Sequence, residues 1–273
     1  MIKRLVLFTF WFLVLTFSSY AVEIEPMRLE YSLQNGKTYS GSFRLKNTSN
    51  FAVEIFISTG DYRYIFSQNT IPPEKNKTAL PSCESWFNFE KTKLNLNSGE
   101  FCDAKFFIKV PPDASSEQLC AVIFDEKRGL QETVRKENAG NIQINLTPRF
   151  SIPVYISIKG AEKIAAEITE MSAVLEPQEG GVKFNITLHN MGNVHIRPFG
   201  TLVIFNQKEE VVKNLPIGKS LPIFPDYKER LLVICSKLPA GKYSAIATVE
   251  ISKDNIVQKK TPFTCTKTGE IDI

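Results

Sequence analysis

The sequence lacks most of the residue patterns that carry enzymatic chemistry. Only two of its 273 residues are histidines, His189 and His195, and no Gly-x-Ser-x-Gly, phosphate-binding loop or His-Glu-x-x-His pattern is present. The histidines flank a turn in "LHNMGNVHIRPFG", without an acidic or thiol ligand at a spacing typical of metal sites. We therefore predict a protein that is not an enzyme, binds no metal and needs no cofactor. Both histidines are expected in cross-strand or surface positions.

Concentrated basic charge is also missing. The 33 lysines and arginines are dispersed among 29 aspartates and glutamates, which leaves a net charge of +4. Proteins that grip phosphate backbones usually carry dense basic patches interleaved with aromatic residues. Nucleic acid is therefore not an expected partner.

Long apolar runs are limited to one, at the N-terminus. Lys3 and Arg4 precede an apolar stretch over residues 5–17, and Ser19 and Ala21 provide the small residues of a cleavage site. The stretch is shorter than the roughly 20 residues needed to span a bilayer. We predict that residues 1–21 are a cleaved secretory signal peptide, with a retained anchor as the alternative. The mature chain is then exported, with no later transmembrane segment.

Cysteine is scarce, and its number is odd. None of the five cysteines forms a Cys-x-x-Cys pair, which argues against a thioredoxin-like or zinc-ribbon site. Cys235 and Cys265 are the only two in the second half, so they are the preferred disulfide pair in an oxidising compartment. Three pairings remain open among Cys83, Cys102 and Cys120, with one thiol left over. In the alternative, several cysteines are simply buried as small apolar residues.

Long helical periodicity is missing as well, and short alternating runs take its place. Examples are "TYSGSFRLKN", "WFNFEKTKLNL", "FCDAKFFIKV" and "YSAIATVEIS", separated by turns rich in Gly, Asn and Pro. The strand spacing and the chain length predict an all-β fold with two immunoglobulin-like β-sandwiches in tandem, over residues 22–159 and 160–273. Residues 161–175 are compatible with a short helix, but their alternation favours a strand.

One alternating run is longer than an ordinary strand. Residues 140–160, "GNIQINLTPRFSIPVYISIKG", contain Pro148 and Pro153 and follow a charged segment, 125–141, that we interpret as an unusually long loop. Proline removes a backbone donor and is confined to strand edges, so one side of this strand is expected to be unpaired for part of its length. An exposed apolar edge is a liability unless a partner strand adds to it. We therefore predict an interaction edge.

At this point the chain resembles the PapD-like periplasmic chaperones of pilus assembly. The resemblance rests on "IEPMRLEYSLQNGKTYSGSFRLKNTSN", on "VPPDA" before "LCAVIFDE", and on the long loop before the alternating strand. The chain is also similar to a looser set of exported bacterial proteins of the same two-domain plan, through "WFNFEKTKLNLNSGE" and "NMGNVHIRPFGTLVIF". The resemblance covers nearly the whole mature chain.

The resemblance implies a periplasmic location and a role for particular residues. Two basic residues of that family clamp the C-terminal carboxylate of a pilin subunit, and Arg28 matches the first by its place in the opening strand. Arg149 is the nearest candidate for the second, two positions before the expected register at Ser151. The alternating residues that would fill the subunit groove are Ile142, Ile144 and Leu146; alternatively they point into the core of their own domain. The implied partners are secreted pilin-like or surface-structure subunits and an outer-membrane usher.

Two other classes of function stay open from the sequence. A structural or adhesive protein of the cell surface could use the same sandwiches without a client subunit, and its edge strand would then be covered within the molecule. An extracellular ligand-binding module would instead need a concave pocket with convergent polar groups between the domains. The client identity and the oligomeric state do not follow from the residues.

Overall fold

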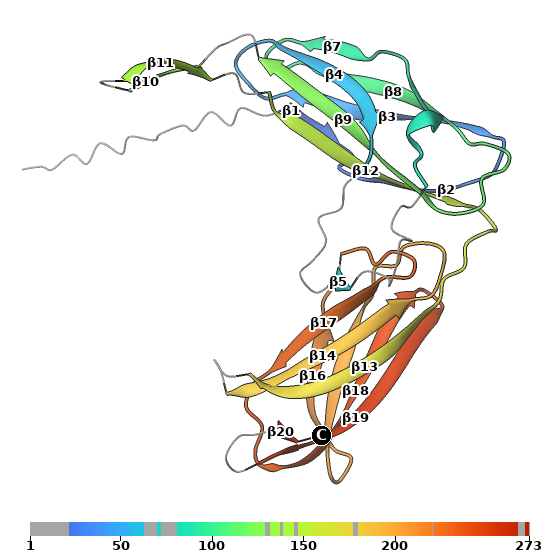
Figure 1. Cartoon of the computed structure of the whole chain (residues 1–273), viewed down its shortest axis with the longest axis vertical. Coiled ribbons are helices and arrows are strands. Elements are labelled where there is room, and N and C mark those ends of the chain that lie inside the picture. The colour runs from blue at the N-terminus through green and yellow to red at the C-terminus, as the bar shows by residue number, and fades with distance from the viewer. Residues whose placement is uncertain are drawn as a thin grey trace, which may run out of the picture.

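The computed structural model of the protein is all-β and forms two β-sandwiches, which confirms the predicted fold class (Figure 1). The structure describes residues 22–62, 70–71, 81–128, 132–136, 139–144, 147–176, 180–219, 221–266 and 271–272. Within these ranges the only helix is η1 (Glu84–Trp86), a short 3-10 turn. No helix in the described part of the chain is long and apolar enough to cross a membrane. The predicted signal peptide, residues 1–21, lies outside the described residues.

The first sandwich packs two sheets around one core. One sheet has the order β1 (Val22–Glu25), β3 (Thr38–Asn47), β8 (Phe101–Lys109), β6 (Phe87–Phe89). The other has the order β2 (Leu29–Leu33), β12 (Arg149–Ile158), β9 (Gln118–Arg128), β4 (Val53–Gly60), β7 (Lys93–Leu96). The largest fully buried side chains between the sheets are the phenylalanines Phe43, Phe106 and Phe124.

The second sandwich follows the same plan. One sheet has the order β13 (Ala166–Glu176), β14 (Gly181–Asn190), β17 (Lys228–Cys235), β5 (Thr70–Ile71). The other has the order β16 (Val211–Ile217), β15 (Phe199–Asn206), β18 (Gly241–Ser252), β19 (Asn255–Cys265), β20 (Ile271–Asp272). Strand β13 confirms the strand prediction for most of 161–175. In Figure 1 the teal strand β5, from the first half of the chain, lies beside β17.

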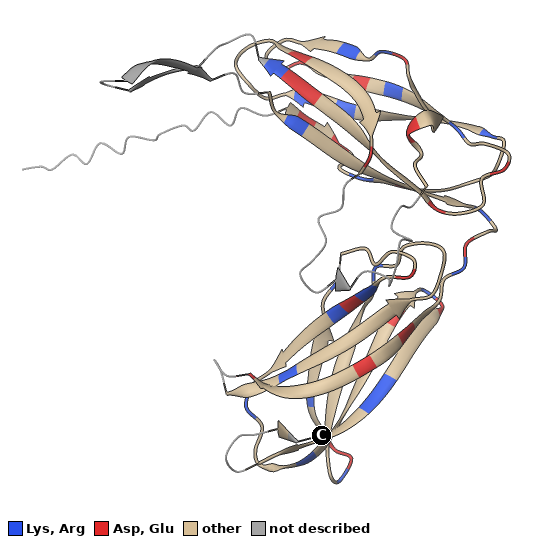
Figure 2. Ribbon diagram, in the orientation of Figure 1, with Lys and Arg blue, Asp and Glu red and all other residues tan. Residues whose placement is uncertain are grey.

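A short segment connects the last strand of the first sandwich to the first long strand of the second. Strand β12 ends at Ile158 and β13 begins at Ala166. The predicted domain limits, 22–159 and 160–273, agree with this order of strands but remain a prediction, since β5 of the first half joins the second sandwich. Figure 2 shows basic and acidic residues interspersed over both sandwiches.

Alternating burial explains why these residues form strands. In β8 the side chains of Ala104, Phe106 and Ile108 are buried, while their neighbours along the strand are exposed or half-buried. Successive side chains of a strand point to opposite faces, so this pattern places one apolar face on the core. Burying a Phe or Ile side chain stabilises the fold by about 1.5–3 kcal/mol. The alternation therefore fixes the face of each strand.

The first strand of the chain is divided between the two sheets. Strand β1 pairs with β3 in one sheet, while β2 pairs with β12 in the other, beginning with Leu29 beside Val154. The predicted single strand in "WFNFEKTKLNL" is divided in the same way, into β6 beside β8 and β7 beside β4. The single-strand prediction was wrong because alternation reports which face is buried and not which sheet a strand joins.

Two asparagines fold the same turn in the two sandwiches. Asn47 and Asn190 are each fully buried and each end a strand, β3 and β14. The Asn190 side-chain amide donates to the carbonyls of Val194 (2.9 Å) and Ile223 (2.8 Å), and its oxygen accepts from the Gly192 backbone (2.9 Å). A buried side chain that satisfies three backbone groups fixes the path of the chain after the strand.

Replacing Asn190 by Ala should lower the free energy of unfolding by about 2–4 kcal/mol, since three buried backbone groups lose their partner. Urea denaturation of the purified chain measures the change. The control is Asn35→Ala, because Asn35 donates to backbone carbonyls at an exposed position and its loss should cost less than about 1 kcal/mol. Equal losses for the two variants would contradict the role assigned to Asn190.

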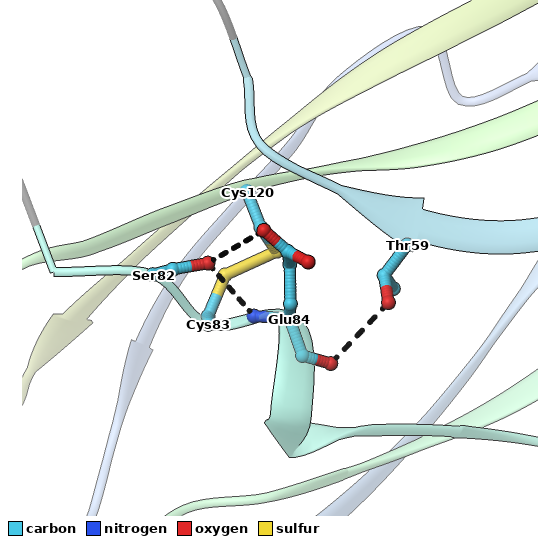
Figure 3. Close-up of a disulfide and its surroundings, with 5 residues drawn as sticks. All are labelled: Thr59, Ser82, Cys83, Glu84 and Cys120. Carbon is cyan, nitrogen blue, oxygen red and sulfur yellow. Dashed lines mark hydrogen bonds between the residues drawn. A yellow bond between two sulfur atoms is a disulfide. The ribbon is translucent and has the colours of Figure 1, made fainter.

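A disulfide fastens the segment before η1 to the first sandwich. Cys83 and Cys120 are bonded, with Cα atoms 5.4 Å apart, and Figure 3 shows the bridge between this segment and β9. The Leu119 backbone donates to the Pro81 carbonyl (2.9 Å) beside it. This resolves which of the three pairings left open by the sequence forms, with Cys102 as the leftover thiol.

The predicted pair Cys235 and Cys265 is not bonded in the structure. Both are free thiols buried in the core of the second sandwich, at the ends of β17 and β19. Burial raises the pKa of both thiols. The neighbouring Cys235 raises the pKa of Cys265 further. The pair prediction is therefore corrected: in this structure the two cysteines act as small apolar core residues.

Replacing Cys83 and Cys120 by Ser should lower the free energy of unfolding by about 2–5 kcal/mol, because the bridge closes a long loop in the unfolded chain. Urea denaturation under oxidising conditions measures the loss, and the parent protein with a reductant should show a similar value. The control is Cys102→Ser, which leaves the bridge intact. A double variant as stable as the parent would contradict the assignment.

Candidate binding site for a partner strand

Strand β12 is paired from its first residue on one side only. On that side Arg149–Ile156 pair antiparallel with β9. On the other side the parallel pairing with β2 begins only at Val154. Among the described residues no strand pairs with Arg149–Pro153 on this second side. The expectation drawn from Pro148 and Pro153, that one edge is unpaired for part of the strand, agrees with this pattern; we call this part of β12 the open edge.

The direction of the backbone groups on the open edge follows from two hydrogen bonds. The Glu126 backbone donates to the Pro148 carbonyl (2.9 Å) on the β9 side, and the Lys159 backbone donates to the Leu33 carbonyl (2.8 Å) on the β2 side. Backbone groups of successive residues point to opposite sides of a strand, so even-numbered residues face β9. The residues whose backbone groups face the unpaired side are Arg149 and Ser151. Pro153 has no N–H, and its carbonyl faces the start of the β2 pairing.

The long predicted strand is divided into two. Residues 139–144 form β11 (Ala139–Ile144), which pairs with β10 (Glu132–Lys136) in a separate two-stranded ribbon. The prediction of a loop over 125–141 was wrong at both ends, because β9 continues to Arg128 and β10 follows. Strand β11 ends at Ile144 and β12 begins at Arg149, directly after Pro148, where alternation alone indicated one strand.

The predicted edge residues lie on this ribbon or beside it. The backbones of Ile142 and Ile144 pair with Val134 and Glu132 of β10. Leu146 lies outside the described residues. The assignment of Ile142, Ile144 and Leu146 to a subunit groove therefore stays a prediction, with the backbone of β11 placed outside the two sheets of the first sandwich.

Arg149, the first residue of β12, forms an ion pair with Asp125 of β9. Its guanidinium makes two hydrogen bonds to the Asp125 carboxylate, from Nε (2.6 Å) and Nη2 (2.9 Å), across the β12–β9 pair. Arg28 precedes Leu29, the partner of Val154, so about four residues of β12, or roughly 13 Å, separate the two arginines along the strand. The structure does not bring Arg28 and Arg149 together as one clamp.

Arg28 lies in a group of charges that spans both sandwiches. Its Nε lies 2.8 Å from Glu30 Oε1 in an ion pair. Arg197, from the second sandwich, donates a hydrogen bond to the same oxygen from Nε (3.0 Å), and its Nη2 lies 3.0 Å away. The His195 Nε2 atom lies 3.6 Å from it. Two guanidinium groups from different sandwiches thus converge on one carboxylate oxygen.

The joint between the sandwiches is apolar beneath these charges. Leu119 and Tyr155, from β9 and β12, belong to the buried cluster that forms the core of the second sandwich. The Tyr155 ring lies 4.5 Å from the His195 ring and 6.4 Å from the Phe224 ring, measured between centroids. Arg197 stacks over Tyr155, with Cζ 5.3 Å from the ring centroid. Shared burial of this kind holds the two sandwiches in one arrangement.

A buried carboxylate adds a polar contact to the joint. The Glu117 side chain is only 2% exposed, and it accepts from the His195 backbone (2.7 Å) and lies 2.6 Å from His195 Nδ1. Sequence reasoning placed His195 in a surface or cross-strand position and did not find Glu117, Glu30 or Arg197. The sequence signal nearby is the apolar run Leu119–Phe124, which is typical of a strand covered on both faces.

The segment between the sandwiches is fastened at both ends. The Glu162 carboxylate accepts from Ser32, from Ser157 (3.1 Å) and from the Gly160 backbone (2.7 Å). Burial alone would raise the pKa of Glu162, but these hydrogen bonds outweigh it and lower the pKa. On the other side, Asn193 binds the Ala161 carbonyl (2.8 Å) and the Lys163 backbone N–H (2.6 Å). The contacts orient β13 relative to β12.

Several solved proteins share this fold. The class 5 fimbriae chaperone CfaA is 14% identical, with 88% of this chain and 99% of that chain covered and a TM-score of 0.45. The YadV chaperone is 12% identical, over 88% and 98% of the two chains, with a TM-score of 0.43. A chaperone–tip adhesion subunit complex of the archaic Csu pili of Acinetobacter baumannii, CsuC–CsuE, matches at 15% identity over 89% and 97%, with a TM-score of 0.40. No protein-family model and no curated protein sequence matches the chain.

All three contain a chaperone, and two of them are named for fimbriae or pili, as in the group that the sequence resembles. At such identities the likeness is one of fold. The alignments cover about 88% of this chain and nearly the whole length of each of these two solved chains.

Tyr155 should make the joint sensitive to alkaline pH. Burial first, and then the neighbouring Tyr62, raise the pKa of Tyr155 from 10.0 to about 12, while Arg197 opposes the rise. The folded chain therefore keeps this phenol protonated where the unfolded chain has lost the proton. Its stabilisation is complete below pH 10 and is lost between pH 10 and about 12.

We expect Tyr155→Phe to show a smaller fall in melting temperature across that alkaline range than the parent, as measured by circular dichroism. Tyr39→Phe, which alters a tyrosine away from the joint, serves as the control. An equally steep alkaline fall in the Tyr155 variant and the parent would argue against this prediction.

Proposed function

We propose that the protein is an exported, periplasmic chaperone-like assembly factor that binds subunits of pili or other surface structures by β-strand addition. The observation that supports this most directly is the open edge of β12. Its backbone groups at Arg149 and Ser151 have no partner strand among the described residues, and this stretch leads into the joint between the sandwiches. Main-chain hydrogen bonds supply the affinity in such complexes, and side-chain pockets set the register.

The charges at the joint indicate the orientation of an added strand. Arg28 lies next to the residue where the open edge ends, because Leu29 is the partner of Val154. Arginine is suited to bind carboxylate groups through its planar fork of donors. A segment that ends in a free carboxylate would therefore place its C-terminus at Arg28 and run parallel to β12. A partner such as a pilin-like subunit, delivered to an outer-membrane usher, fits this arrangement.

The alternative of a structural or adhesive surface protein without a client requires an edge that is covered within the molecule. In the described residues the sheet order ends with β2, which covers β12 only from Val154 onward. The geometry therefore favours the assembly factor.

A proline at Ser151 tests the role of the open edge. The Ser151 N–H faces the unpaired side, so Ser151→Pro removes a donor for a partner strand without breaking the β9 pairing. We expect the melting temperature to change by only a few degrees and the recovery of a bound subunit to fall about tenfold or more. The measurement is affinity recovery of the tagged full-length chain from its own cells, followed by mass spectrometry.

Two variants accompany this test. Ser151→Ala changes the side chain and keeps the N–H, so subunit recovery should match the parent. Phe150→Pro removes a donor that faces β9, so it should destabilise the fold more than Ser151→Pro does. Recovery of the same subunit in equal amount with the parent and with Ser151→Pro would reject strand addition at this edge.

A further inference from the structure

We propose that the outer face of β13, β14 and β17 is a surface on which two copies of this chain pair about a two-fold axis. We call this surface the pairing face; its outward residues on the two flanking strands are Glu167, Glu170 and Val174 of β13 and Lys228, Arg230, Leu232 and Ile234 of β17. The pairing face belongs to the second sandwich, whereas the open edge of β12 belongs to the first. The inference does not rest on the proposed function.

Apolar side chains at one end of the pairing face are exposed to solvent. Val174 is 40% exposed, Leu232 39% and Ile234 51%. The register places Val174 and Ile234 in one row, on either side of Lys183 of β14. Exposed apolar side chains that gather on one surface are typical of protein-binding sites. This end of the face therefore suits an apolar partner surface.

The charges at the other end of the face are separated by sign. The register places Glu167 in the same row as Lys228, and Glu170 in the same row as Arg230, each time with one residue of β14 between them. Glu229 lies between the two basic residues along β17, but its side chain is buried on the opposite face. Figure 2 shows red segments on β13 and blue segments on β17. The face thus has an acidic strand and a basic strand.

These charges are too far apart to neutralise one another within one chain. Two strand spacings, roughly 10 Å, separate β13 from β17. Within the described part of the chain, the one ion pair on this face joins Glu167 to His189 at 3.6 Å, and Glu170, Lys228 and Arg230 form none. Opposite charges on a second molecule could therefore pair with them.

A two-fold axis parallel to the strands matches the two ends of the face. Rotation about this axis lays β13 of each copy over β17 of the other and keeps the rows at the same height. The facing pairs are then Glu170 with Arg230, Glu167 with Lys228, and Val174 with Ile234. Each pair forms twice, because a two-fold interface uses the same patch on both copies. Sheets that pack face to face keep their strands within about 30° of each other, which suits this arrangement.

The middle strand and the size of the face limit the strength of the contact. Lys183 would approach its own copy near the axis, so its long side chain must turn toward solvent. Three strands and eight residues cover roughly 10 by 25 Å. This is less than a standard interface, which buries about 1,200–2,000 Å² in total. We therefore expect a weak, reversible dimer with a Kd on the order of 10–100 µM.

Charge reversals in opposite directions test the pairing. Arg230→Glu and Glu170→Arg should each weaken self-association at least tenfold, because like charges then face each other twice. An equimolar mixture of the two variants should associate about as tightly as the parent, since both facing pairs again join opposite charges. Sedimentation velocity of the full mature chain, at concentrations around the expected Kd, measures the association.

The control is Lys105→Glu, which reverses a charge on the first sandwich at a side chain that is 63% exposed. It should associate like the parent. Circular dichroism should place the melting temperatures of all three variants within a few degrees of the parent, because the altered side chains are exposed. Ser151→Pro should also leave the association unchanged, since it alters the edge of the other sandwich.

A parent chain that stays monomeric in this concentration range would overturn the proposal. So would a mixture of the two charge variants that associates no more tightly than each variant alone. A dimer that persists in both single variants would assign the contact to another surface, such as the open edge of β12, and would likewise reject the pairing face.

Discussion

The division of the first strand between two sheets determines what the surface of the protein can do. Strand β1 closes the edge of one sheet against β3, and β2 reaches β12 only from Leu29 onward. A continuous strand in either sheet would leave the opposite sheet with a complete open edge or cover β12 altogether. Among the described residues, the crossing at residues 26–28 instead leaves the backbone groups of Arg149 and Ser151 without a second neighbouring strand and places Arg28 where the pairing with β2 begins.

The joint between the sandwiches depends on the same strand. Tyr155 lies two residues beyond Pro153, and its side chain is buried in the second core although its backbone belongs to the first sandwich. The strand that carries the open edge is therefore also the strand that holds the second sandwich. Because Glu30 is the partner of Tyr155 on β2, the charged group forms directly over this apolar contact. Edge, charges and joint are set by consecutive positions of one strand pair.

Long alternating runs of the sequence predict the bounds of strands well. The sequence does not predict contacts that depend on strand register or on the packing of the two sandwiches. Strand β3 has the bounds that "TYSGSFRLKN" indicated, and β8 and β18 differ by two residues or fewer. Strand β1, with four residues, was missed because so short a run carries little periodicity. Arg149 was placed in a clamp, but its cross-strand partner Asp125 could not be paired with it until the register was known. Arg197 and Glu30 are 167 residues apart in sequence, so only the packing of the two sandwiches brings them together.

An open edge also invites association between copies of the same chain, and the residues of β12 oppose it. Arg149 projects a charge beside the edge, and charged residues discourage edge-to-edge pairing. Pro153 lacks the donor that a regular ladder needs at the inner end of the edge. Two copies paired through β12 would each contribute these obstacles, whereas a foreign strand meets them once and gains the arginines at the joint. Under the proposed function, these features favour a segment of another protein that ends in a carboxylate over a second copy of this chain.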